Sequence, residues 1–399
     1  MRILVFNTLY YPNLVGGAER SVQLLVEQLR DKGNECIIVT TTDEKDKIDY
    51  VNNIKVYYLN FRNLYWGNKT EDKHFIAKSV WHALDVYNPI MKKRISEIVK
   101  TEKPDVIYTN NLSGFSVVPW IVAKEANIPV AHTLRDYYLL CVKSSMFNGS
   151  DNCNKRCTTC KIYTEYKKNL TNKGYVDHLI GNSHFIVDKH KSEGYFENVP
   201  SSRIFNGTTL QSQKQVQTYE SKRLTFLYLG RIHETKGVNL LLDIFNKNKD
   251  ADLILAGYIF DRKIEERINK GEYSANIKFI GYVETKDILP QIDMLIVPSL
   301  YHEPLARVVL ESYSYGKPVI GSTRGGIPES IDDGKTGFLF DPADKDSLEQ
   351  IVDSLIADPS QLKELSLNLA EFLEGYDIRR TSDQYNELFQ SMGRKEILI

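Results

Sequence analysis

The chain has 399 residues, of which 42% are apolar and 26% charged, and its formal net charge is −1. These are ordinary values for globular proteins, and the length favours two domains. The near-neutral charge excludes a typical nucleic-acid-binding protein, and no apolar run approaches the roughly 18 residues of a membrane-spanning helix. We therefore expect a cytoplasmic protein, or one bound peripherally to the cytosolic face of the inner membrane.

The first forty residues predict a βαβ unit and, with it, a parallel sheet. An apolar strand over Arg2–Asn7 precedes a loop with Gly16 and Gly17, a helix over Arg20–Asp31 and a strand from Cys36. The glycines follow the carboxyl end of the first strand, where backbone can approach a ligand closely. A plain tight turn explains the pair equally well. The absence of G-x-G-x-x-G weakens a dinucleotide interpretation.

Aromatic and basic residues are mixed between Phe61 and Lys100, including Tyr65, Trp66 and Trp81. On helices, such residues can contact an acceptor molecule or an anionic lipid surface. Ordinary core packing with a solvated polar face is the alternative.

Two more strands are expected over Asp105–Thr109 and Ile128–Leu134, and the second runs directly into Arg135 and Asp136. A cation and a carboxylate at the carboxyl end of a strand are typical of a site in an open α/β sheet, where ligands bind. The alternative is a surface contact between the two side chains.

Four of the five cysteines fall within twenty residues, in the loop 141–160. In a reducing compartment, four thiols at such spacing suggest a structural metal, most simply tetrahedral zinc. Free thiols in a loop, or a disulfide, are the alternatives. The candidate ligands are Cys141, Cys153, Cys157 and Cys160.

A polar, aperiodic stretch over 211–223 is the expected interdomain linker, and a second α/β series follows it. Arg231 and Lys236 lie in the loop between the first strand and first helix of this series. Two cations in such a loop can converge on a diphosphate, although scattered surface cations remain an alternative.

The stretch from Pro298 to Gly326 predicts strand, loop and helix, with the helix over about 305–315. Pro304 suits the first helical position, which would turn free backbone N–H groups towards an anion, most naturally a phosphate. Two carboxylates, Glu303 and Glu311, lie roughly 12 Å apart along this helix. That separation suits a nucleotide-sugar, with hydroxyls at both ends and a diphosphate between them. The alternative is a solvated helix with an i,i+4 pair between Arg307 and Glu311.

Six motifs in order, covering nearly the whole chain, resemble the retaining glycosyltransferases of family 4, of the type that builds bacterial surface polysaccharides. They are Gly16-Gly17-Ala18-Glu19, Gly230-Arg231, Lys236-Gly237, Glu303 with Glu311, Gly325-Gly326-Ile327-Pro328-Glu329 and Asp333-Gly334-Lys335-Thr336-Gly337.

The resemblance implies the GT-B fold, an α/β architecture of two Rossmann-like domains whose parallel sheets face a central cleft. The expected divisions are an acceptor domain over 1–207, a nucleotide-sugar domain over 208–376, and a C-terminal helix over 377–399 that crosses back to the first domain.

For the site, the resemblance implies that Arg231 and Lys236 contact the diphosphate, Glu303 the transferred sugar and Glu311 the ribose. In the family a His-Asp pair commonly follows the strand before the cysteine loop, and Arg135-Asp136 stands at this place here. Arg135 is therefore expected to hold a sugar hydroxyl or phosphate instead of the usual His. The remaining candidate donor-binding residues are Gly16, Gly17, Leu305, Ala306 and Arg307.

The leading hypothesis is a retaining hexosyltransferase that needs no metal or other cofactor for catalysis. It would move a sugar from a nucleotide-sugar, UDP-linked in preference to GDP-linked, to a hydroxyl of a saccharide or lipid-linked acceptor in polysaccharide or glycolipid synthesis. The alternatives are a nucleotide-sugar epimerase of the same fold and a non-catalytic sugar-nucleotide-binding protein.

Overall fold

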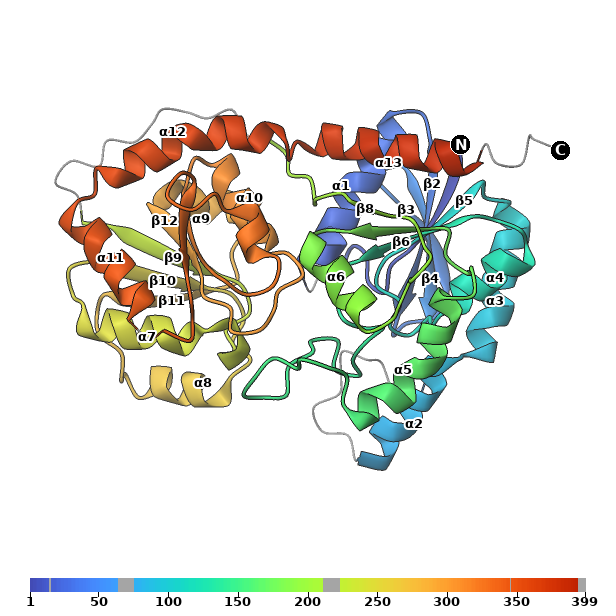
Figure 1. The fold of residues 1–399 in the computed structure, drawn as a ribbon, viewed down its shortest axis with the longest axis horizontal. Helices are drawn as coiled ribbons and strands as arrows, with labels where there is room; N and C mark the ends of the chain where they lie inside the picture. The colour runs from blue at the N-terminus through green and yellow to red at the C-terminus, as the bar shows by residue number, and fades with distance from the viewer. Residues whose placement is uncertain (14–15, 64–74, 211–222, 345, 394–399) are drawn as a thin grey trace. The chain divides into compact units, whose positions relative to one another are not determined.

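The computed structural model describes residues 1–13, 16–63, 75–210, 223–344 and 346–393. The chain forms two compact units (Figure 1). The first unit comprises Met1–Met146, Cys153–Gly207 and the C-terminal segment from Ile378, and the second comprises Phe147–Asn152 and Thr208–Asp377. The expected linker over 211–223 lies outside the described residues except for Arg223.

The first unit is built on a sheet with the strand order β3-β4-β2-β1-β5-β6-β7-β8 among its described residues. Its centre is apolar on both faces, since Ile3, Leu4, Val5 and Phe6 of β1 are fully buried, as in parallel sheets covered by helices. The strands are β1 (Arg2–Phe6), β2 (Glu35–Thr42), β3 (Lys47–Val51), β4 (Ile54–Asn60), β5 (Val106–Thr109), β6 (Val130–Leu134), β7 (His178–Gly181) and β8 (Ser201–Arg203).

One strand departs from the expected parallel arrangement. β3 pairs with β4 in the antiparallel direction, whereas the other pairings of this sheet are parallel. The turn between them contains Asn52 and Asn53, both with positive φ, which is the backbone of a tight hairpin turn. The largely exposed β3 therefore closes one edge of the sheet without a crossover helix.

Helices flank this sheet (Figure 1). They are α1 (Gly17–Asp31), α2 (Phe75–Val86), α3 (Pro89–Glu102), α4 (Val118–Glu125), α5 (Thr158–Thr171), α6 (His184–Ser192) and α13 (Ile378–Gly393).

The last helix, α13, belongs to the first unit although it follows the whole of the second in sequence. Its Tyr385 and Phe389 are buried in the core formed around β1 and α1. Asn34 Nδ2 donates to Asn386 Oδ1 at 2.9 Å, and Lys32 pairs with Asp383 at 2.5 Å. Apolar burial and polar contacts together therefore fix this helix to the first unit.

The second unit has a parallel sheet with the order β11-β10-β9-β12-β13-β14. Its strands are β9 (Thr225–Leu229), β10 (Asp252–Ala256), β11 (Ile277–Gly281), β12 (Met294–Val297), β13 (Val319–Ser322) and β14 (Gly337–Phe340). Its helices are α7 (Val238–Lys247), α8 (Arg262–Asn269), α9 (Thr285–Ile288), α10 (Arg307–Ser314), α11 (Ser347–Ala357) and α12 (Gln361–Glu374), with short 3-10 turns η1 (Glu234–Lys236), η2 (Leu289–Gln291) and η3 (Ile327–Ser330).

The predicted α/β architecture of two mainly parallel sheets is thus confirmed. Because β9 and β12 lie at the centre of the second sheet, the loops that follow their carboxyl ends meet at one edge. Within the described ranges, no helix is long and apolar enough to cross a membrane.

The first prediction concerns His190, which is fully buried on α6. Burial lowers its pKa to about 4, so the unfolded chain takes up a proton at a higher pH than the folded chain does. Lowering the pH from about 6.5 to 4 should therefore cost stability, on the order of 3 kcal/mol for this one group.

Chemical unfolding at several pH values measures this loss. His190→Gln should reduce it, whereas His184→Gln, a change at an exposed position of the same helix, should leave it as in the wild type. Equal acid sensitivity in the wild type and His190→Gln would contradict the assignment.

Candidate functional site

A buried ion pair lies at the carboxyl edge of the second sheet. Lys236 Nζ lies 2.5 Å from Glu303 Oε1, and the Glu303 residue is only 8% exposed. Ser299 Oγ donates to the same oxygen at 2.7 Å, and Tyr301 OH donates to Oε2 at 2.6 Å. The loop after β9 and the loop after β12 are therefore joined at this carboxylate.

These contacts keep Glu303 ionised. Burial by itself raises the pKa of a carboxyl group, but the Lys236 ammonium and the hydroxyls of Tyr301 and Ser299 outweigh it and lower the pKa of Glu303 below its ordinary value. The site thus presents a fixed negative charge beside a fixed positive one.

Two glycines allow the loops to approach this closely. A Cβ on Gly237, whose φ is +73°, would lie 1.9 Å from the Pro298 carbonyl oxygen. A Cβ on Gly325, whose φ is +65°, would lie 2.1 Å from the Glu303 carbonyl oxygen. Any side chain at either position would push the Glu303 loop away, so these motif glycines are required by packing as well as by backbone conformation.

Asn152 also holds this loop, and sequence reasoning missed it. Its Nδ2 donates to the Leu300 carbonyl at 2.8 Å, and its Oδ1 accepts from the His302 N–H at 2.8 Å. Asn152 ends the segment Phe147–Asn152, which belongs to the second unit although the cysteines on both sides of it belong to the first. No local pattern could reveal a contact across about 150 residues.

The helix after Glu303 begins later than predicted. α10 starts at Arg307 with Ala306 as its N-cap, so Pro304 and Leu305 lie in the loop and not in the first turn. The physical reason is the bond from Gly326 N to the Glu303 carbonyl at 2.7 Å, which holds the chain extended before the helix. The helix N-terminus is consequently formed by residues from Arg307 onward.

On α10, Arg307 pairs with Glu311 at 2.8 Å, and both side chains are largely buried. This i,i+4 pair is the structural alternative considered for the helix. A ribose contact by Glu311 stays a prediction, and it would have to form beside the Arg307 guanidinium.

Arg231 lies in the same edge loop and is exposed. Its carbonyl accepts from Tyr228 OH at 2.5 Å, and no ion pair of its guanidinium is found among the described residues. Its charge is therefore available to an anion at this edge.

In the first unit, Gly16 and Gly17 begin α1. Gly16 is the N-cap, and its N–H donates to Glu19 Oε2 at 2.9 Å. Both glycines are exposed, so a close backbone approach to a ligand and a plain turn are both compatible with their geometry.

Arg135, in contrast, is 9% exposed and its guanidinium is occupied by protein. Nε donates to Asn110 Oδ1 at 2.8 Å, Nη1 to Asn206 Oδ1 at 2.5 Å and Nη2 to Tyr108 OH at 3.4 Å. The expected contact of Arg135 with a sugar or phosphate has no support in this geometry. Its contacts instead join the ends of β5 and β6 to the segment that leaves the first unit.

Asp136, the next residue, is half-buried at this edge. Burial raises the pKa of Asp136 to about 6. A hydrogen bond from the Tyr138 N–H to Oδ1, at 2.8 Å, acts in the opposite direction. His132 packs instead between Trp120 and Phe196 in the core.

The cysteine loop brings three of its thiols together. Cys160 hydrogen-bonds to both Cys141 and Cys157, and with backbone N–H groups these contacts lower the pKa of Cys141 to about 5. Within the described part of the chain, however, no group of three or more His, Cys, Asp or Glu side chains is placed to hold a metal ion. The thiols as they lie do not fit a four-thiolate zinc, and the zinc site stays a prediction.

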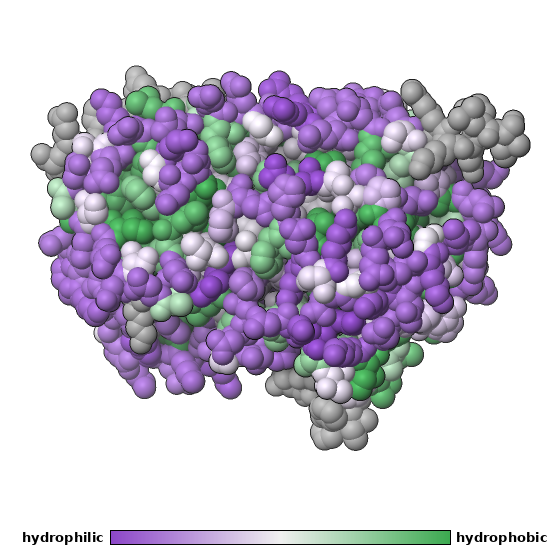
Figure 2. All heavy atoms as spheres, viewed as in Figure 1, coloured by the Kyte–Doolittle hydropathy of each residue, from purple (hydrophilic) through white to green (hydrophobic). Residues whose placement is uncertain are grey.

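The aromatic and basic stretch divides between core and surface. Trp81 is buried and stacks on Phe61, as the packing alternative expects, whereas Tyr65 and Trp66 lie outside the described residues. Exposed apolar side chains do occur on α2 and α5, at the lower end of Figure 2, and membrane contact there stays a prediction. They include Val80, Leu84, Ile162 and Tyr166.

Two family models and several known proteins are similar to this chain. Residues 15–211 match the family model described as Glycosyltransferase Family 4, and residues 211–371 match the model described as Glycosyl transferases group 1. A Klebsiella pneumoniae protein described as uncharacterized, in the cps region, is 33% identical over 330 residues, covering 82% of this chain and 87% of its own.

Two further proteins are similar along the whole length. The lipopolysaccharide core biosynthesis glycosyltransferase LpsE of Rhizobium meliloti is 22% identical over 94% of this chain and 96% of its own. The crystal structure of Anabaena HepE in complex with UDP-glucose superposes with a TM-score of 0.72 at 19% identity, covering 98% of this chain and 100% of HepE.

The second prediction tests Arg135. Arg135→Ala should remove the buried donor from the side-chain oxygens of Asn110 and Asn206 and lower the free energy of unfolding by roughly 2–4 kcal/mol. The affinity for UDP, measured by calorimetry, should stay unchanged, and Arg20→Ala, at an exposed position of α1, should change neither quantity. Loss of transfer without loss of stability would return Arg135 to the catalytic residues.

The third prediction concerns the relative reactivity of two thiols, those of Cys157 and Cys153. Cys157 is exposed, and N–H groups at the start of α5 lower its pKa, whereas burial raises the pKa of Cys153. Iodoacetamide at pH 7.5 should therefore alkylate Cys157 before Cys153, as read by mass spectrometry. Protection of Cys157 by equimolar zinc would support the metal prediction. If zinc does not slow the alkylation of Cys157, and the protein is active without metal, the metal prediction is wrong.

Proposed function

We propose that this chain, which belongs to the GT-B glycosyltransferases, transfers a hexose from a nucleotide-sugar to a hydroxyl of a saccharide or lipid-linked acceptor, with retention of configuration. UDP is the favoured nucleotide, because the similar HepE structure was determined with UDP-glucose. The relatives reported above favour polysaccharide or lipopolysaccharide synthesis as the setting.

The observation that carries this proposal is the largely buried ion pair of Lys236 and Glu303, with the exposed Arg231 in the same loop as Lys236. A nucleotide-sugar has a diphosphate that needs positive charge and a sugar that develops positive charge at its anomeric carbon during transfer. One loop supplies the cations and the other the carboxylate, and both are fixed before any ligand binds.

In this mechanism Arg231 and Lys236 neutralise the leaving diphosphate, assisted by the N-terminus of α10. Leu305 and Ala306, in the loop ahead of that helix, and Arg307 at its start line the same donor site. Glu303 accepts hydrogen bonds from sugar hydroxyls and stabilises the positive sugar ring, and Glu311 contacts the ribose. The residues themselves supply the charge, so the proposal requires no metal for catalysis.

On the first unit, the proposal assigns Gly16 and Gly17 to backbone contacts with the ligand and Asp136 to the acceptor hydroxyl. The pKa of Asp136, about 6, leaves it mainly ionised at neutral pH and able to accept that hydroxyl proton.

The fourth prediction is that Glu303→Gln and Lys236→Ala each lower the transfer rate by ~10²- to 10³-fold, because each removes one pre-organised charge from the site. Transfer from UDP-sugars to a panel of acceptors, followed by mass spectrometry, measures the rate. Glu272→Gln and Lys263→Ala change exposed residues of the same unit and serve as matched controls.

Activity of both site variants within a few-fold of the wild type would sink the donor-site assignment. Conversion of the nucleotide-sugar without any acceptor product would instead favour the epimerase alternative.

A further inference from the structure

Two cysteines of the first unit lie one turn apart at the start of α5. Cys157 is the N-cap residue, and Cys160 is the third residue of the helix. The Lys161 N–H donates to the Cys157 carbonyl at 2.9 Å, so the hydrogen bonds of α5 already begin at Cys157. The C-x-x-C pair therefore occupies the first turn of a regular helix.

This position brings the two sulfur atoms close together. Cys157 has the extended backbone of an N-cap, with φ of −69° and ψ of 170°. The side chain of an N-cap residue turns back over the N–H groups of the second and third helical residues, and Cys160 is the third. Residues three apart on a helix have Cβ atoms about 5–6 Å apart, close to the separation of about 3.5–4.5 Å in a disulfide. A small movement of the N-cap residue thus suffices to join the two sulfurs, and the rest of the helix need not move.

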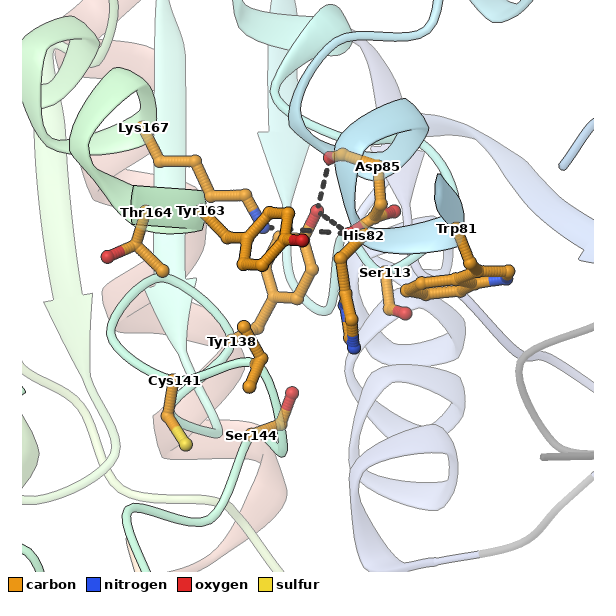
Figure 3. Close-up of a pocket in the computed structure, with 11 residues that line it drawn as sticks. Trp81, His82, Asp85, Ser113, Tyr138, Cys141, Ser144, Tyr163, Thr164 and Lys167 are labelled. Carbon is orange, nitrogen blue, oxygen red and sulfur yellow. Dashed lines mark hydrogen bonds and ion pairs between the residues drawn. The ribbon is translucent and has the colours of Figure 1, made fainter. Parts of the chain in front are cut away.

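Cys160 is the central thiol of this cluster. Its side chain contacts the thiols of both Cys157 and Cys141, although Cys141 lies on the segment after β6. Cys141 and Thr164 of α5 line the same small pocket (Figure 3), and Thr164 Oγ donates to the Cys160 carbonyl at 2.8 Å. Packing of α5 against that segment therefore places a third sulfur beside the pair.

The two members of the pair differ in their access to solvent. Cys157 is exposed, whereas Cys160 is only 5% exposed. A reagent in solution therefore reaches the Cys157 sulfur first, and Cys160 can react only with what has formed there. An accessible cysteine next to a second, resolving cysteine is the usual arrangement of redox-sensing thiols.

The surroundings of Cys157 are positively charged. Lys155 and Lys161 are both exposed, and Lys161 lies four residues after Cys157, on the same face of the helix. These cations favour a small reagent that carries negative charge.

The arrangement favours a bond between sulfurs over a shared metal ion. In the part of the chain that the structure describes, no three His, Cys, Asp or Glu side chains surround a common metal position. Cys160 nevertheless contacts two other thiols directly. Thiols that contact one another without a common centre are placed to form a disulfide.

We propose that Cys157 and Cys160 form a reversible dithiol–disulfide site whose oxidant is a small anionic disulfide such as oxidised glutathione. The Cys157 thiolate attacks one sulfur of the oxidant and releases the first glutathione as a thiolate, which takes up the proton that Cys157 has lost. Cys160 then attacks the Cys157 sulfur of the mixed disulfide and releases the second glutathione, which takes up the Cys160 proton. The two cysteines lose two electrons and two protons, and the oxidant gains both. This inference does not depend on the proposed function.

The test is oxidation of the full chain, freed of metal with a chelator, by mixtures of oxidised and reduced glutathione. Free thiols are then alkylated, and the protein is digested with trypsin. Arg156 and Lys161 enclose the pair, so residues 157–161 are released as one peptide. This peptide should lose the mass of two hydrogens and carry no alkyl group, and dithiothreitol should restore both alkylation sites.

Three variants separate the roles of the thiols. Cys157→Ser should slow oxidation of the buried Cys160 about tenfold or more, because the accessible sulfur is gone. Cys160→Ser should stop at a stable mixed disulfide between Cys157 and glutathione, provided that its thermal unfolding matches the wild type. Cys153→Ser, a change at a half-buried cysteine outside the pair, should leave formation of the bond unchanged.

A mixed disulfide that persists on Cys157 of the wild type would overturn the proposal, as would a bond mapped to Cys141 or Cys153 in place of Cys157. Resistance of both thiols to oxidised glutathione would also overturn it. Zinc that stays bound after treatment with the chelator and blocks the reaction would do the same, and it would favour the metal prediction instead.

Discussion

The cost of burying an unpaired charge determines how the loops at the carboxyl edge of the second sheet are arranged. A carboxylate placed in a protein interior without a partner costs several kcal/mol, so Glu303 can occupy its loop only while Lys236 lies beside it. The loops after β9 and β12 must then touch, which in turn requires glycine at 237 and 325. Asn152 completes the arrangement from a distant part of the chain. The ion pair thus determines both the shape of the edge and its electrostatics.

The first unit also buries charged side chains, and it supplies partners for them in two different ways. Arg135 donates to three neutral oxygens, one from each of its guanidinium nitrogens. Lys167 lies against one carboxylate and one aromatic face. Two buried cations of the first unit are therefore stabilised in different ways, one by neutral oxygens and the other by an ion pair.

Local sequence pattern predicts most of the second sheet because its strands are short apolar runs that end at glycine, proline or polar residues. It also finds Lys236 and Glu303, since both follow strands whose carboxyl ends meet. It misplaces the start of α10, because the Glu303 carbonyl is held by Gly326 and local rules cannot include that bond. The protein contacts of Arg135 escape local pattern for the same reason. Its partner Asn206 lies 71 residues further on, and only folding brings the two together.

The place of Arg135 clarifies how the first unit differs from the usual pattern of the family. An imidazole at this position would be short and titratable near neutral pH, whereas Arg135 is long, permanently charged and turned into the core. In the proposed mechanism the acid-base role at this edge belongs to Asp136, whose pKa burial raises to about 6. The neighbouring Tyr138 links that carboxyl to Asp85 and Lys167. Under this proposal Asp136 handles the proton, while the Arg135 guanidinium holds the ends of β5 and β6 in place.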